Sequence, residues 1–273
     1  MKKTLLLLIT ALISYYGGAQ ENIKKNTFAI NYGIGYITRQ DLIFSPFIHK
    51  DFTAVDLGIE YSREAKFYQK IRFNYAAFNP MVYNSYQFTE YGKSQNALPH
   101  AFNLIDIDYL IGKKIYENKN HRLAAGALLT NSIQAMNYVY GRFGNFGYFA
   151  NSGIGFFIRE TISINDESNI NATIQLPVIS WLARSPYLVN DDTFIENISS
   201  HSGFKSFIGF VGDGKLVTWD QLQTIDLELK YICLVKEKWG LGIGYNFEFI
   251  HSKLPRNLIS FRNTLNISAN IKF

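Results

Sequence analysis

Charged side chains lie two or four positions apart, and so on one face of an extended strand, in three stretches of the first half of the chain. The stretches are VDLGIEYS (55–62), FYQKIRFNYA (67–76) and IDIDYLIG (105–112), and their charged positions are Asp56, Glu60, Lys70, Arg72, Asp106 and Asp108. A tight turn near residue 65 would place Glu60 opposite Lys70 and leave Arg72 near Asp56. Both basic residues would also face the two aspartates of the third stretch. Because an unpaired buried charge is costly, we predict an internal network of ion pairs. A selective polar pathway is the alternative.

Two carboxylates are predicted to meet in the second half of the chain. A turn near residues 236–237 would set Asp226 opposite Glu248, with Arg262 diagonally across from Glu248. Adjacent carboxylates can form a cation site or an acid–base pair. The alternative is that Arg262 and Lys230 neutralise them.

The elements that must position these groups are strands, because ten stretches alternate between apolar and polar or small residues. They are residues 27–37, 55–62, 67–76, 105–112, 122–130, 153–162, 170–178, 224–233, 239–249 and 263–273. In the first of them, Ile30, Tyr32 and Ile34 share one face, while Asn31 and Gly33 lie on the other. The pattern predicts an all-β fold.

Composition indicates a β-protein with a large apolar surface. Aromatic residues make up 16% of the chain and charged residues only 18%, below the usual quarter or so. No stretch after the N-terminal segment is long and apolar enough to form a transmembrane helix. Cys233 is the only cysteine, which excludes an internal disulfide framework.

The N-terminal sequence MKKTLLLLITALISYYGGAQ has the order of regions of a secretory signal peptide, with two lysines, an apolar run and then small residues. We expect residues 1–19 to be cleaved and residues 20–273 to form the mature protein. Loss of Lys2 and Lys3 lowers the formal net charge from +5 to +3. That small excess gives no reason to expect a nucleic-acid partner.

The connections between the strands alternate in length. Short polar turns are expected near residues 64, 117–120, 165–168 and 236–238, and long loops near 39–51, 79–101, 139–147, 183–215 and 252–257. Short turns at one end and long loops at the other are typical of an outer-membrane barrel. We therefore predict an antiparallel, up-and-down transmembrane β-barrel with ten strands, eight or twelve being the alternatives.

The many aromatic rings decide which face of the strands points outward. A soluble, lipocalin-like barrel would turn its apolar residues inward. The lumen of a ten-strand barrel is too small for so many phenylalanine and tyrosine rings, whereas a lipid surface accommodates them. The apolar face is therefore predicted to contact outer-membrane lipid, with the charged and small residues inside.

The last nine residues, LNISANIKF, carry a resemblance to a known family. They alternate strictly and finish on Phe273, and this resembles the C-terminal assembly signal of bacterial outer-membrane β-barrel proteins. The resemblance implies a location in the outer membrane of a Gram-negative bacterium. It also implies that the barrel-insertion machinery reads the final strand and Phe273.

Three functional classes remain open. The first is a small channel or permeability protein, or a barrel with a structural and surface-binding role. The second is an outer-membrane hydrolase that uses groups at the rim. The third is a subunit of an envelope secretion or transport assembly, docking through the loop 183–215 with its four phenylalanines, Phe194, Phe204, Phe207 and Phe210.

The hydrolase class has weak support in the sequence. Ten-stranded outer-membrane proteases need acidic residues and a histidine at the rim, and the candidates here are Asp191, Asp192, Glu196, His201 and His251. Their spacing does not reproduce that family's pattern. His251 and Ser252 are similar to the residue pair of lipid A deacylases, but they are adjacent and would face opposite sides of a strand. We assign no catalytic residue, cofactor or metal site.

Overall fold

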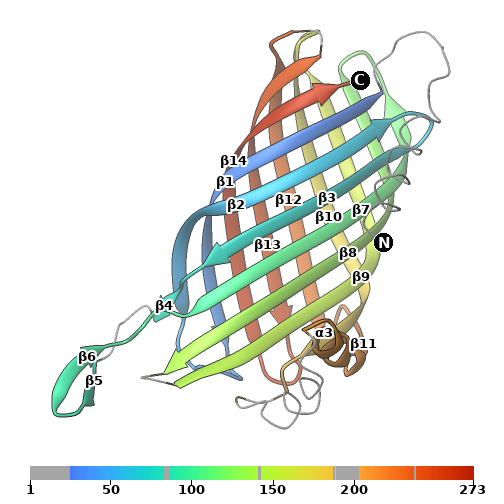
Figure 1. The fold of residues 1–273 in the computed structure, drawn as a ribbon. Helices are drawn as coiled ribbons and strands as arrows, with labels where there is room; N and C mark the ends of the chain where they lie inside the picture. The colour runs from blue at the N-terminus through green and yellow to red at the C-terminus, as the bar shows by residue number, and fades with distance from the viewer. Residues whose placement is uncertain (1–24, 83–86, 141–142, 187, 189–202, 237) are drawn as a thin grey trace, which may run out of the picture.

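The computed structural model describes residues 25–82, 87–140, 143–186, 188, 203–236 and 238–273, so the expected signal peptide lies outside the described residues. Ten long antiparallel strands form the barrel (Figure 1). They are β1 (Asn26–Asp41), β2 (His49–Glu64), β3 (Tyr68–Phe78), β7 (Ala101–Glu117), β8 (His121–Tyr140), β9 (Phe143–Ser163), β10 (Ser168–Arg184), β12 (Leu222–Leu234), β13 (Trp239–Ser252) and β14 (Leu258–Lys272).

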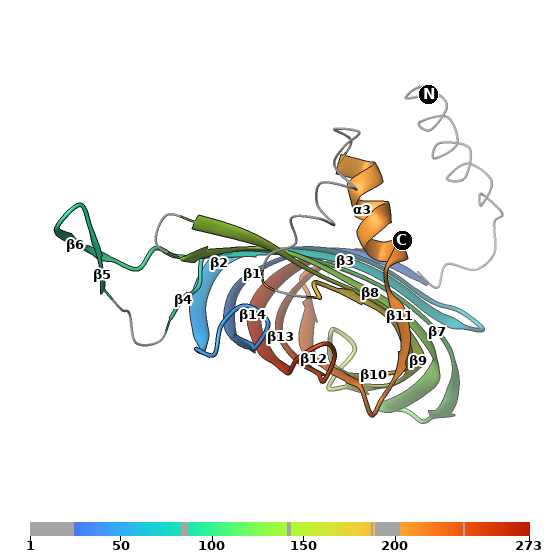
Figure 2. The same cartoon turned by 90° about the horizontal axis from the view of Figure 1, so that it is seen from below.

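The barrel is closed because β1 pairs with both β2 and β14. Around the ring the strands follow their order in the chain, and the view along the barrel in Figure 2 shows them enclosing the lumen. The ten-strand prediction is confirmed, and the eight- and twelve-strand alternatives are wrong. Because of this closure, each of the ten barrel strands has a hydrogen-bonded neighbour on both sides.

The two faces of the strands are sorted as predicted. On β1 the side chains of Ile30, Tyr32 and Ile34 are about half exposed on the outer surface, while Ala29 and Ile37 are buried inside. The same outward apolar row continues on the other strands and forms the surface that contacts lipid. Within the described residues no helix combines the length and apolar character needed to cross a membrane.

The short connections occur where they were expected, after Glu64, Glu117, Ser163 and Leu234. The longer connections lie at the opposite end of the barrel. The segment 79–101 contains β4 (Met81–Val82) and a hairpin of β5 (Gln87–Glu90) with β6 (Lys93–Asn96), which projects away from the barrel in Figure 1. The segment 183–215 contains α3 (Gly203–Gly212), which leads to the short strand β11 (Lys215–Thr218) beside β10.

The expected loop at 139–147 is wrong, because β8 and β9 remain paired as far as Tyr140 and Phe143. Gly144 and Gly147 resemble turn residues in the sequence, but they lie within β9. At Gly144 the Oδ1 atom of Asn137 lies 2.8 Å from where a Cβ would stand. At Gly147 the Phe44 ring fills the corresponding space. These glycines are explained by close packing rather than by a turn.

Candidate functional site: the charge-paired lumen

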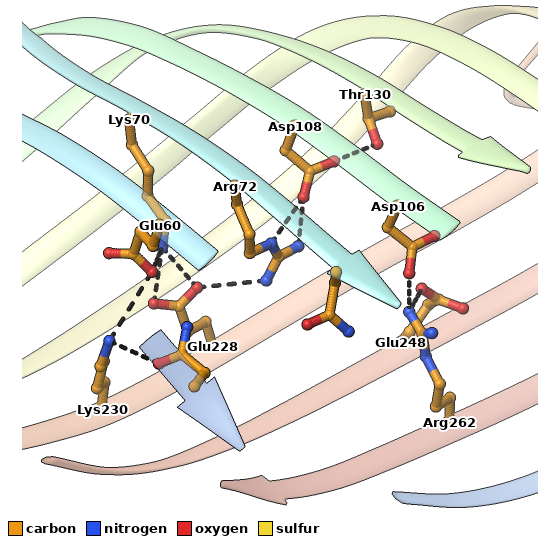
Figure 3. A network of polar contacts seen from close by, with 12 residues as sticks. Glu60, Lys70, Arg72, Asp106, Asp108, Thr130, Glu228, Lys230, Glu248 and Arg262 are labelled. Atoms are coloured by element: carbon orange, nitrogen blue, oxygen red, sulfur yellow. Dashed lines mark hydrogen bonds and ion pairs between the residues drawn. The ribbon is translucent and has the colours of Figure 1, made fainter. Parts of the chain in front are cut away.

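A four-residue cluster fills the lumen toward the short-turn end (Figure 3). Lys70 Nζ donates hydrogen bonds to both carboxylate oxygens of Glu228, at 2.8 and 2.7 Å. Glu60 Oε2 lies 3.1 Å from the same ammonium, and Lys230 Nζ lies 3.8 Å from Glu60. Lys70 is buried. The two lysines and two glutamates therefore neutralise one another across the lumen.

Arg72 continues the network toward the middle of the barrel. Its Nε and Nη2 atoms donate to Asp108 Oδ2 at 2.9 and 2.5 Å, and Nη1 lies 3.4 Å from Glu228. Thr130 Oγ1 donates to the other oxygen of Asp108 at 2.6 Å. Arg72 lies directly opposite Asp108 in the pairing of β3 with β7. The guanidinium of Arg72 therefore links the four-residue cluster to Asp108 on β7.

Arg262 occupies the next position in the network. Its Nη2 atom pairs with Glu248 at 2.6 Å and with Asp106. Asp226 lies opposite Glu248, as the turn length predicted, and Arg262 is directly opposite Glu248 rather than diagonal to it. Lys230 does not neutralise this group, because it contacts Glu60.

The predicted register between β2 and β3 is wrong, although the expected ion pair between Glu60 and Lys70 does form, at 3.1 Å. Glu60 lies opposite Arg72 in the backbone register, and Ser62 takes the place opposite Lys70. The turn covers residues 65–67, which moves the register by two positions from the expected one. Asp56 is consequently far from Arg72 in the register. It accepts hydrogen bonds from Asn74 at 3.2 Å and from Thr264 at 2.9 Å.

The mid-lumen space beside Asp226 is very small. Two cavities of about 20 Å³ lie there, both lined by Arg72, Asp106, Asp226 and Glu248. Each has room for about one water molecule. In the described part of the chain, no group of three or more histidine, cysteine, aspartate or glutamate side chains is arranged to hold a metal ion.

An apolar plug, which the sequence analysis missed, closes the long-loop end. The connection 42–48 folds into the barrel and buries Phe44, whose ring stacks on Tyr138 with centroids 4.3 Å apart. Tyr140 donates its hydroxyl hydrogen to the carbonyl of Phe44. The ring packs against Gly147, where any side chain would collide with it.

Buried polar side chains anchor the plug. Arg184 Nη2 donates to Asp41 Oδ1 at 2.6 Å, and Arg39 Nη2 lies 3.2 Å from Asp41 Oδ2. Arg39 Nη1 also donates to Gln134 at 2.6 Å. Arg184 Nη1 holds the β13–β14 connection through the carbonyl of Leu254, also at 2.6 Å. The signal was present in the sequence, because Arg39 and Asp41 continue the inward alternation of β1.

Of the rim candidates, only His251 and Ser252 lie within the described residues, and their side chains do not contact each other. His251 makes contacts of 3.1 and 2.8 Å with the side-chain oxygens of Gln223 and Asn257, so both ring nitrogens face amides. Ser252 is buried and donates to the carbonyl of Leu254 at 2.9 Å. The two neighbours point to opposite faces, as expected. The acidic candidates Asp191, Asp192 and Glu196, together with His201, lie outside the described residues.

Three further residues that were predicted to contact partners have definite positions. Phe210 of α3 stacks on Tyr148, with centroids 4.4 Å apart, so it is already packed against the barrel. Phe207 is exposed, whereas Phe194 lies outside the described residues. Phe273 exchanges backbone hydrogen bonds with Asn26 at 3.1 and 2.9 Å, and its ring is exposed.

The closed ten-strand barrel and its continuous apolar outer surface define this chain as an integral β-barrel protein of the bacterial outer membrane. Its fold is similar to that of the outer membrane protease OmpT from Escherichia coli, with a TM-score of 0.60 and 7% identity over 94% of this chain and 99% of that one. The sequences are too different for this likeness to show more than the fold.

Other barrels align with lower scores. The translocator domain of the autotransporter NalP from Neisseria meningitidis gives a TM-score of 0.43 and 9% identity, covering 99% of this chain and 96% of that one. Neisserial surface protein A gives a TM-score of 0.37 and 10% identity, covering 90% of this chain and 97% of that one. No family model matches the chain, and no curated protein matches it in sequence.

Proposed function

We propose that this protein is a closed outer-membrane barrel with a structural and surface-binding role, and that it is not an open diffusion channel in this state. The observation that carries the proposal is the contact between Lys70 on β3 and Glu228 on β12. Four strands separate β3 from β12 in either direction around the ring, so this ion pair spans the barrel at its widest.

The rest of the lumen supports the same conclusion. Arg262 reaches from β14 to Asp106 on β7, and the Phe44 plug closes the long-loop end independently. An ion crossing the barrel would have to break the network and also displace the plug. The loop end, in contrast, offers contact surface. The β5–β6 hairpin projects from it, and Tyr91 at the hairpin tip is 84% exposed.

The orientation and partners follow from the same reasoning. We place the short turns in the periplasm and the long loops outside the cell, as in other outer-membrane barrels. Among the described residues of the 183–215 loop, Phe207 and Ile208 of α3 are exposed and offer an apolar surface for an envelope partner. The final strand and Phe273 are the segment that the insertion machinery would read.

Planar-bilayer recording of the refolded protein tests the closed lumen. The wild type should be silent. The triple variant Phe44→Ala, Lys70→Ala, Arg72→Ala, which opens both the plug and the network, should conduct. Adding Lys113→Ala to the wild type is the control, because the Lys113 ammonium lies over the Phe67 ring, 5.6 Å from its centroid, and does not line the lumen cavities. Steady ion-selective current through the wild type would overturn the proposal.

A further inference from the structure

A large cavity opens beneath the network at the short-turn end of the barrel. Its volume is about 540 Å³, and its wall includes Ala65 and Glu117, which lie at hairpin ends. The cavity therefore reaches the rim. Its inner end is formed by Lys70, Glu60 and Glu228, whose mutual contacts close the lumen above it. The result is a blind vestibule that is open on one side only.

Basic groups dominate the described wall of this vestibule. Seven basic side chains line it, namely Lys25, Lys70, Lys114, Arg122, Arg159, Lys230 and Lys272. Four acidic side chains accompany them, Glu60, Glu64, Glu117 and Glu228.

Each of those four carboxylates is already in contact with a basic group of the same wall. Lys70 contacts Glu60 and Glu228. Arg122 and Arg159 contact Glu64 at 2.9 and 3.2 Å. Lys114 contacts Glu117 at 3.1 Å. The wall thus carries a positive excess that its own carboxylates do not balance.

One of the basic groups is held rigidly. The Arg159 guanidinium stacks over the Tyr68 ring, 4.3 Å from its centroid, and donates to Asn171 at 2.7 Å. Its side chain is only 12% exposed. A fixed guanidinium loses little conformational freedom on binding a carboxylate or phosphate, which favours recognition of an anion.

We propose that the vestibule binds a small soluble polyanion that carries two or more phosphate or carboxylate groups. A blind cavity with one sign of excess charge and low-dielectric walls concentrates counter-ions of the opposite sign. The volume suits a small molecule rather than a folded partner. This inference rests on the closed lumen, since a conducting barrel would pass the anion rather than retain it.

Isothermal titration of the refolded protein with pyrophosphate, and separately with citrate, tests the proposal. The test variant is Lys114→Gln with Arg122→Gln, two wall residues that are about one-third exposed. Its matched control is Lys66→Gln with Lys113→Gln, which removes the same charge from exposed residues outside the wall. Loss of two anion contacts should weaken binding at least about tenfold, whereas the control should bind like the wild type.

The outcomes separate the two proposals. Saturable binding of either anion by the wild type, weakened only in the test variant, supports the vestibule. Failure of both anions to bind, or equal weakening in the control, overturns it. Conductance recorded on the same preparation reports on the closed lumen alone, because a silent protein that binds neither anion contradicts only the vestibule.

Discussion

Lys70 Nζ and Glu228 Oε2 meet at 2.7 Å inside the lumen, although their strands lie on opposite walls of the barrel. Both side chains are almost fully buried, at 2% and 9% exposure. A buried ion pair adds little net stability over an apolar pair, but removing one partner leaves an uncompensated charge. The contact therefore makes closure of the lumen costly to reverse.

The first prediction concerns this pair. Lys70→Met or Glu228→Gln alone should lower the free energy of unfolding by about 3–5 kcal/mol, because each takes the nearest opposite charge away from a buried member of the network. The double variant should lose clearly less than the sum of the two. Urea unfolding in lipid vesicles measures all three. The same set of two single variants and one double variant at Lys114 and Glu117, at the rim, should give a coupling energy below about 1 kcal/mol. If the losses in unfolding free energy at Lys70 and Glu228 were additive, the two side chains would not interact, which would contradict the ion pair between them.

The second prediction concerns the plug. Phe44→Ala should cost about 3–5 kcal/mol in unfolding free energy, because a buried ring is replaced by a cavity. Gly147→Ala should destabilise the wild type by collision with that ring, and the penalty should shrink in the Phe44→Ala background. Phe47→Ala is the control, since Phe47 belongs to the same connection but is 53% exposed. If Gly147→Ala lowered the unfolding free energy equally in both backgrounds, the Phe44 ring would not be packed against Gly147.

The third prediction is a pH dependence. His100 lies in the connection before β7, and its Nδ1 atom accepts a hydrogen bond from the Val139 amide at 2.8 Å. Burial, aided by the neighbouring His49 ring, lowers the pKa of the His100 imidazole from 6.5 to about 4. The unfolded state then binds more protons between these values. The free energy of unfolding should therefore be fully retained above pH 6.5 and should fall as the pH drops toward 4.

His100→Asn isolates this contribution, because the amide oxygen can still accept from Val139 but does not titrate. The variant should lose less stability than the wild type between pH 7.5 and pH 4.5, with a difference of up to about 3 kcal/mol. Urea titrations at the two pH values measure it. Identical losses in both proteins would show that other titratable groups account for the whole effect.

Much of the fold follows from local sequence. Strand alternation separates the lipid-facing row of Ile30, Tyr32 and Ile34 from the lumen row, and polar turn residues mark the short connections. Asp226 and Glu248 also follow from a single hairpin, because one turn length sets their register. These features depend on neighbouring residues only.

The contacts that were predicted wrongly or missed depend on features that the sequence of a single hairpin does not contain. The two-residue shift at Glu60 depends on how residues 65–67 form the turn. The partner of Lys230 depends on the stagger of all ten strands. The stagger determines which residues on opposite walls lie at the same height along the barrel axis. The Phe44 plug depends on a connection folding inward, and its sequence, LIFSPFI, does not distinguish that from an exposed loop.

The lumen contacts also bear on how the barrel is assembled. Lys70 and Glu228 are 158 positions apart in the chain, and Asp56 and Thr264 are 208 apart. Neither contact can form while the sheet is still open, so a partly curled sheet presents bare charges on one side and apolar rings on the other. Closing the β1–β14 seam in the correct register buries the charges in the same step that completes the lipid-facing surface. A barrel closed in the wrong register would leave these charges without partners in the lumen and should be less stable than the correct one.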